Sequence, residues 1–236
     1  LAILPVWMGR YIEIVGEKSS ESIADTLING IFGRVTGDAG SRFVIAIGQA
    51  IFLVLFLILY GDCIAARQRI GAVYFFSRIS NRKKWILKEF VWLLFYSVLY
   101  TFCFVGMHMI FSIWGSSEAN LSGTLFKVAF QIGLFLTLLL FEMAVLCNLF
   151  CAAGGSAIGI LLSMLCVIGL IMWSTAEVDG VVSEMINPMW LSADIIENGG
   201  SYIQKIIIVF LQTAICAVGT GYYLAKRDLF AREGEG

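Results

Sequence analysis

Long apolar stretches alternate with shorter polar segments along this chain. Five of the stretches hold about 20 or more predominantly apolar residues, the length that an α-helix needs to cross a bilayer. Helices also satisfy their own backbone hydrogen bonds inside lipid. The pattern predicts an all-α fold, a polytopic membrane helix bundle that forms a single transmembrane domain over residues 1–236. The predicted spans are 43–61, 90–113, 125–150, 156–174 and 203–225.

Two polar segments carry patterns of their own. The chain begins LAILPVW, without methionine, so we expect residues 1–7 to be the outer end of an earlier span. The rest of 1–42 is then external, and 20–32 has the pattern of an amphipathic helix. In 175–202 we expect short helices on the outer membrane face. Those helices are 182–186 and 191–196, broken at Asn187-Pro188, with the second ended by Gly199-Gly200.

Composition supports the membrane prediction. The chain is 59% hydrophobic and only 14% charged, with a mean hydropathy of +0.88. Soluble domains carry about 25% charged residues. A net charge of −1 gives no argument for a nucleic-acid partner, and we expect none. The six cysteines have no zinc-site spacing, so we interpret them as small packing residues and predict no metal site.

Basic residues gather between the first two predicted spans. Segment 62–89 holds seven lysines and arginines against Asp62 and Glu89. Segments of this kind mark the cytoplasmic side of a membrane. Placing 62–89 inside also places the C-terminal tail inside, and it leaves 114–124 and 175–202 outside. The 175–202 segment agrees, because it has five acidic residues and no basic one.

The basic segment 62–89 is the strongest functional candidate in the chain. One interpretation is a helix that couples the membrane domain to a soluble ATPase. The other is a topology determinant that lies against anionic lipid headgroups. The residues alone leave both open. The residues predicted to couple to an ATPase are Arg67, Arg69, Tyr74, Phe76, Arg78, Arg82 and Lys83.

Polar residues within the spans are the second candidate set. Glu142 is the one charged residue deep within a predicted span, where ionisable groups face protein or water. It is either a contact for substrate or protons, or a carboxyl that bonds to a neighbouring helix or lies near the inner membrane interface. The residues that could line a path are Glu142, Gln49, Gln131 and Asn148.

The chain contains no nucleotide-binding or hydrolase motif of the common kinds, so we predict no catalytic residues and no cofactor of its own. Energy for any transport would come from a partner or from an ion gradient.

Three stretches resemble the ABC transporter type 2 permeases, the exporter-type family. They are YFFSRISNRKKWILKE (74–89), INPMWLSADI (186–195) and GTGYYLAKRDL (219–229). The resemblance covers about 40–230 and is greatest to bacterial permeases of peptide or bacteriocin export and of antimicrobial-peptide immunity. Such permeases have six spans, so the resemblance implies a first span before Leu1.

The resemblance implies a half-transporter. Two permease chains, identical or paralogous, would pair in a bacterial plasma membrane, each seated on a nucleotide-binding ATPase subunit that holds ATP and Mg. The cargo would be a peptide or an amphipathic or hydrophobic molecule. The alternative is a gradient-driven secondary carrier or channel that uses Glu142. A membrane enzyme fits less well, because no paired catalytic groups lie near one interface.

Overall fold

The computed structural model describes residues 39–71, 82–115, 123–175, 186–188, 191, 195, 196 and 198–226, together with Leu27 and Ile31. Side chains are not described for 39–49, 69–71, 111, 112, 114, 115, 174 and 175. The predicted amphipathic helix 20–32 lies outside the described residues, except that Leu27 and Ile31 are helical and buried.

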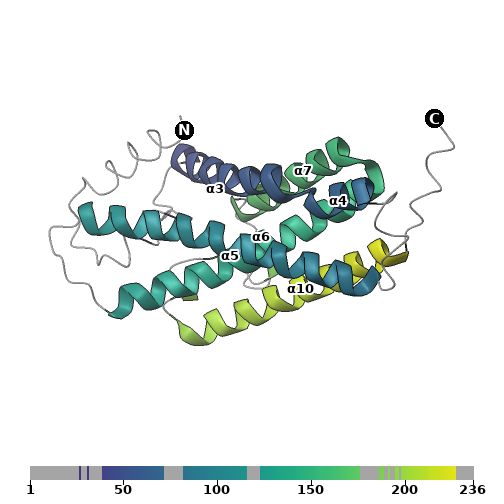
Figure 1. Cartoon of the computed structure of the whole chain (residues 1–236). Coiled ribbons are helices and arrows are strands. Elements are labelled where there is room, and N and C mark those ends of the chain that lie inside the picture. The colour runs from purple at the N-terminus through teal and green to yellow at the C-terminus, as the bar shows by residue number, and fades with distance from the viewer. Residues whose placement is uncertain are drawn as a thin grey trace.

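The described part of the chain is helical and contains five helices that are long and apolar enough to cross a membrane. This confirms the predicted all-α membrane bundle. The long helices lie lengthwise beside one another, and one short helix lies at one end of the bundle (Figure 1). The helices are α3 (Ala39–Tyr60), α4 (Cys63–Gly71), α5 (Arg82–Gly115), α6 (Gly123–Gly154), α7 (Ser156–Thr175) and α10 (Gly199–Lys226).

Helix α6 forms the centre of the bundle. It packs against α3, α4, α5, α7 and α10, and it crosses the middle of the molecule in Figure 1. In its most apolar stretch 67% of the residues are buried, against 22% in α5, α7 and α10. The outer helices therefore expose most of their apolar side chains, as lipid-facing helices do, whereas α6 is enclosed by protein.

Several predicted boundaries shift for local reasons. The second span begins at Arg82 instead of residue 90, because the basic run contains good helix formers and continues the helix. Gly199 and Gly200 are the first residues of α10, not the end of an outer helix. The Asn198 side chain caps them, because its Oδ1 accepts from the Gly200 N–H at 3.2 Å and the Ser201 N–H at 3.4 Å.

The predicted turn at 151–155 is shorter than expected. Helix α6 continues to Gly154, and Gly155 alone separates it from α7. Gly155 has a φ of 94°, a conformation that favours glycine. Gly159 allows α7 to fold back closely, because a Cβ atom there would lie 2.3 Å from the Cys151 backbone nitrogen.

Candidate functional site at the basic end of the bundle

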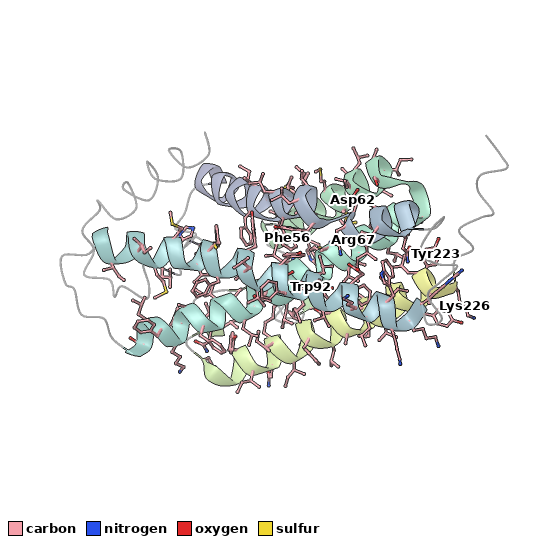
Figure 2. The ribbon with its side chains drawn as sticks, in the orientation of Figure 1. Phe56, Asp62, Arg67, Trp92, Tyr223 and Lys226 are labelled. Atoms are coloured by element: carbon pink, nitrogen blue, oxygen red, sulfur yellow. The ribbon has the colours of Figure 1, made fainter. Side chains whose placement is uncertain are left out.

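Basic side chains collect at one end of the bundle, here called the basic end, where α4 lies, α5 begins and α10 finishes. In Figure 2, Lys226 of α10 lies at the right end of the bundle, and Arg67 of α4 lies between that end and the middle. The side chains of Lys83, Lys84 and Lys88, in the first turns of α5, are exposed. The described parts of the basic segment 62–89 therefore form the whole of α4 and the first turns of α5.

The structure places part of the predicted coupling set. Arg67, Arg82 and Lys83 lie at the basic end. Arg69 is in α4, but its side chain is not described. Tyr74, Phe76 and Arg78 lie outside the described residues.

Asn148 of α6 caps the start of α4. The first N–H groups of a helix have no partner within that helix. Here the Asn148 Oδ1 atom accepts from the Ile64 N–H at 2.9 Å and from the Ala65 N–H at 3.1 Å. Its Nδ2 group donates to the Ala144 carbonyl at 2.8 Å, which fixes the amide orientation. The side chain is fully buried. A residue predicted to line a path thus has a structural bond to α4.

Gly61 brings the corner between α3 and α4 into close contact with the same part of α6. A Cβ atom at Gly61 would lie 2.4 Å from the Leu57 carbonyl oxygen and 2.7 Å from the Cys147 Sγ atom. Only glycine therefore fits without rearrangement. We call Gly61, Cys147 and Asn148 the α4 seat, because together they fix the beginning of α4 on the central helix.

An ion pair joins α4 to α5. The Arg67 guanidinium bonds to the Glu89 carboxylate, which is 8% exposed, while the Arg67 side chain is 49% exposed. The sequence analysis assigned no role to Glu89, which it noted only as one of two acidic residues in the basic segment. Glu89 holds Arg67 through a contact between α5 and α4, and the two residues are 22 positions apart in the chain.

The predicted path residues do not form one cluster. Gln131, Glu142 and Asn148 all lie on α6, but at about 1.5 Å per residue they are spread along its axis. Gln131 is buried, and its backbone carbonyl accepts from the Tyr202 O–H of α10 at 2.9 Å. Gln49 is in α3 with an undescribed side chain. The Glu142 carboxyl contacts α10, as the interpretation of a carboxyl bonded to a neighbouring helix expects.

A second polar cluster was not anticipated from the sequence. Lys205 of α10 is fully buried, and its ammonium donates to the Asn187 carbonyl. Seven residues further along, Gln212 Nε2 donates to the Ile186 carbonyl at 2.9 Å. Asn187 Nδ2 donates in turn to the Leu170 carbonyl of α7 at 3.2 Å. The only signal in the sequence was a lysine and a glutamine seven residues apart, on one helix face.

These bonds locate the predicted break at Asn187-Pro188. Residue 186 is helical and 187 is not, as expected for a break there, but most of the two predicted helices 182–186 and 191–196 lies outside the described residues. The segment 186–188 lies beside α10 and near the end of α7. Gln212 is 13 residues after Gly199, so it lies about 20 Å along α10. Lys205, which bonds the neighbouring Asn187, is six residues after Gly199, or about 9 Å along the helix. The polypeptide at 186–188 therefore lies beside the first half of α10.

A comparison with family models, curated protein sequences and solved structures finds no match for this chain. Among the described residues, no group of three or more His, Cys, Asp or Glu side chains is placed to hold a metal ion. Fold and site together define a helical membrane protein with a short basic helix fixed to its central helix.

Proposed function

We propose that this chain is the membrane-spanning permease subunit of an ATP-binding cassette exporter. Two such chains would form the translocation path, and a separate ATPase subunit would drive each of them. The observation that carries the proposal is the anchoring of α4, a short basic helix, to α6 through Asn148 and to α5 through Arg67 and Glu89. The three stretches that resemble type 2 permeases support the same function.

The anchoring of α4 suits the transmission of movement. A helix of nine residues is marginal on its own, so its structure depends on its attachments. The α4 seat holds its first turn on α6, and the ion pair holds its second turn on α5. A displacement of α4 by a partner would therefore move the helix at the centre of the bundle.

The basic end of the bundle also has positive charge that a partner could recognise. The side chains of Lys83, Lys84 and Lys88 are exposed there, and acidic groups on a soluble subunit would complement their positive charge. With this end in the cytoplasm, as the positive-inside rule favours, the site faces the compartment that supplies ATP. The cargo in this proposal is a peptide or an amphipathic or hydrophobic molecule.

The test is purification of the tagged full chain from its native membranes in a mild detergent. We expect a soluble ATPase to remain bound in stoichiometric amount. The variant carrying R78E and R82E is expected to insert normally but to lose that partner or its coupled ATPase activity. A well-folded chain that reproducibly purifies alone, or a charge-reversed variant that still couples fully, would contradict the proposal.

A gradient-driven carrier is the second candidate, and the buried Glu142 is the observation that favours it. An ionisable side chain within a span is a common element of proton and ion pathways. In that case the carboxyl, and not α4, would carry the function.

A further inference from the structure

The Glu142 carboxyl lies between the central helix and the last helix of the bundle. It is 5% exposed, near the middle of the described length of α6. Its Oε2 atom is 3.3 Å from the Thr213 Oγ1 atom, and its Oε1 atom is 3.8 Å from the Cys216 Sγ atom. Both partners come from α10, three residues apart, and so lie on one face of that helix.

The Thr213 hydroxyl lies near two oxygen atoms but can donate a hydrogen bond to only one of them. A threonine hydroxyl has one hydrogen to donate. Thr213 Oγ1 is 2.8 Å from the Val209 carbonyl oxygen, one turn back in its own helix, and 3.3 Å from Glu142 Oε2. The shorter contact is the common bond of a helical threonine to the carbonyl four residues before it. Once the hydrogen is there, the Thr213 oxygen presents only lone pairs to Glu142.

An ionised carboxylate has only acceptor oxygens. It would then face the lone pairs of Thr213 with no hydrogen between them. The remaining partner, the Cys216 thiol, is a weak donor. Within the described part of the chain no lysine or arginine forms an ion pair with Glu142. A charge here would therefore be buried without adequate compensation.

We infer that Glu142 carries a proton in this structure and donates it to the Thr213 hydroxyl oxygen, while Oε1 accepts from the Cys216 thiol. The site is thus a proton-binding site between α6 and α10, occupied in this arrangement of the helices. As a neutral acid, Glu142 joins the two helices and does not present a negative charge to a cation. This inference does not depend on the proposed function.

Infrared difference spectroscopy on the purified full chain in lipid nanodiscs tests the protonation directly. The difference between the unaltered protein and the variant E142Q at neutral pH is expected to show loss of a protonated carboxylic acid C=O band. The matched control is E89Q, because Glu89 pairs with Arg67 and is expected to lose carboxylate bands instead. Loss of carboxylate bands in E142Q would overturn the inference.

A second variant tests the hydrogen bond and protects against a failure of E142Q to fold. Thr213→Val keeps the side-chain shape and removes the oxygen that accepts the proton. The acid band, assigned to glutamate by ¹³C labelling, is expected to persist in T213V at a shifted frequency. An unshifted band, or the absence of any glutamic acid band in the unaltered protein, would overturn the inference.

Discussion

Asn148 illustrates how one buried amide can determine the position of a neighbouring helix. Its side chain uses both polar atoms, with two bonds to the backbone of α4 and one to its own helix. The α4 backbone is 83 to 84 residues distant in the chain. The sequence identified Asn148 as an unusual polar residue within a span, but no local pattern could supply its partner.

Loss of the cap is expected to weaken α4. Asn148→Ala leaves the Ile64 and Ala65 N–H groups without an acceptor, which costs about 1–3 kcal/mol per buried group. We expect a lower thermal unfolding midpoint and faster reaction of Cys63, the first residue of α4, with a water-soluble maleimide. Peptide mapping by mass spectrometry measures the reaction rate.

Asn148→Asp provides the comparison, because its carboxyl as a neutral acid can still accept from both N–H groups and can donate to the Ala144 carbonyl. Cys63 should react more slowly in N148D than in N148A. Equal rates in the unaltered protein and N148A would show that the cap does not hold α4.

At the scale of elements, the helices were predictable and their junctions were not. The spans follow from apolar length alone, so α5, α6, α7 and α10 agree with prediction over most of their residues. Junctions depend on single residues whose effect is spatial. Gly155 permits a one-residue turn, and Gly159 permits close contact with Cys151. Gly169 of the same helix as Gly159 faces open space. No local sequence pattern distinguishes the two structurally important glycines from Gly169.

The close packing of α6 and α7 gives a prediction at this scale. Gly159→Ala places a methyl group 2.3 Å from the Cys151 backbone nitrogen, so the two helices must separate. Overpacking of this kind costs about 1–3 kcal/mol. We expect a lower unfolding midpoint by tryptophan fluorescence in detergent.

Gly169→Ala is the matched control on the same helix, because no atom lies within 4 Å of a Cβ atom there. It should leave the midpoint unchanged or raise it slightly, since alanine favours helix over glycine. If G159A and G169A have the same midpoint, the α6–α7 contact is looser than described.

At the scale of the whole molecule, the two candidate functions differ in what they require of Glu142. An exporter driven through α4 needs only the hydrogen bonds of a neutral side chain at this position, and glutamine can supply an amide donor and an acceptor there. A carrier needs a carboxyl that binds and releases a proton or cation. Because we propose the exporter, we expect E142Q to retain most of the transport activity.

Transport by reconstituted vesicles, with the unaltered chain measured in parallel, decides between these functions. Dependence on ATP and a partner with little effect of E142Q agrees with the exporter. Complete loss of transport in a folded E142Q protein would favour the carrier.

The contacts between α6 and α10 also bear on how the chain is made. Glu142 and Gln131 emerge from the ribosome long before α10, yet their partners Thr213 and Tyr202 lie 71 residues later in each case. Until α10 is inserted, Glu142 of α6 lacks Thr213 and Cys216, the two side chains that it contacts in the bundle. These contacts therefore form only after α10 has been made, and a ribosome product that stops before α10 would present cellular quality control with an unfinished polar surface on α6.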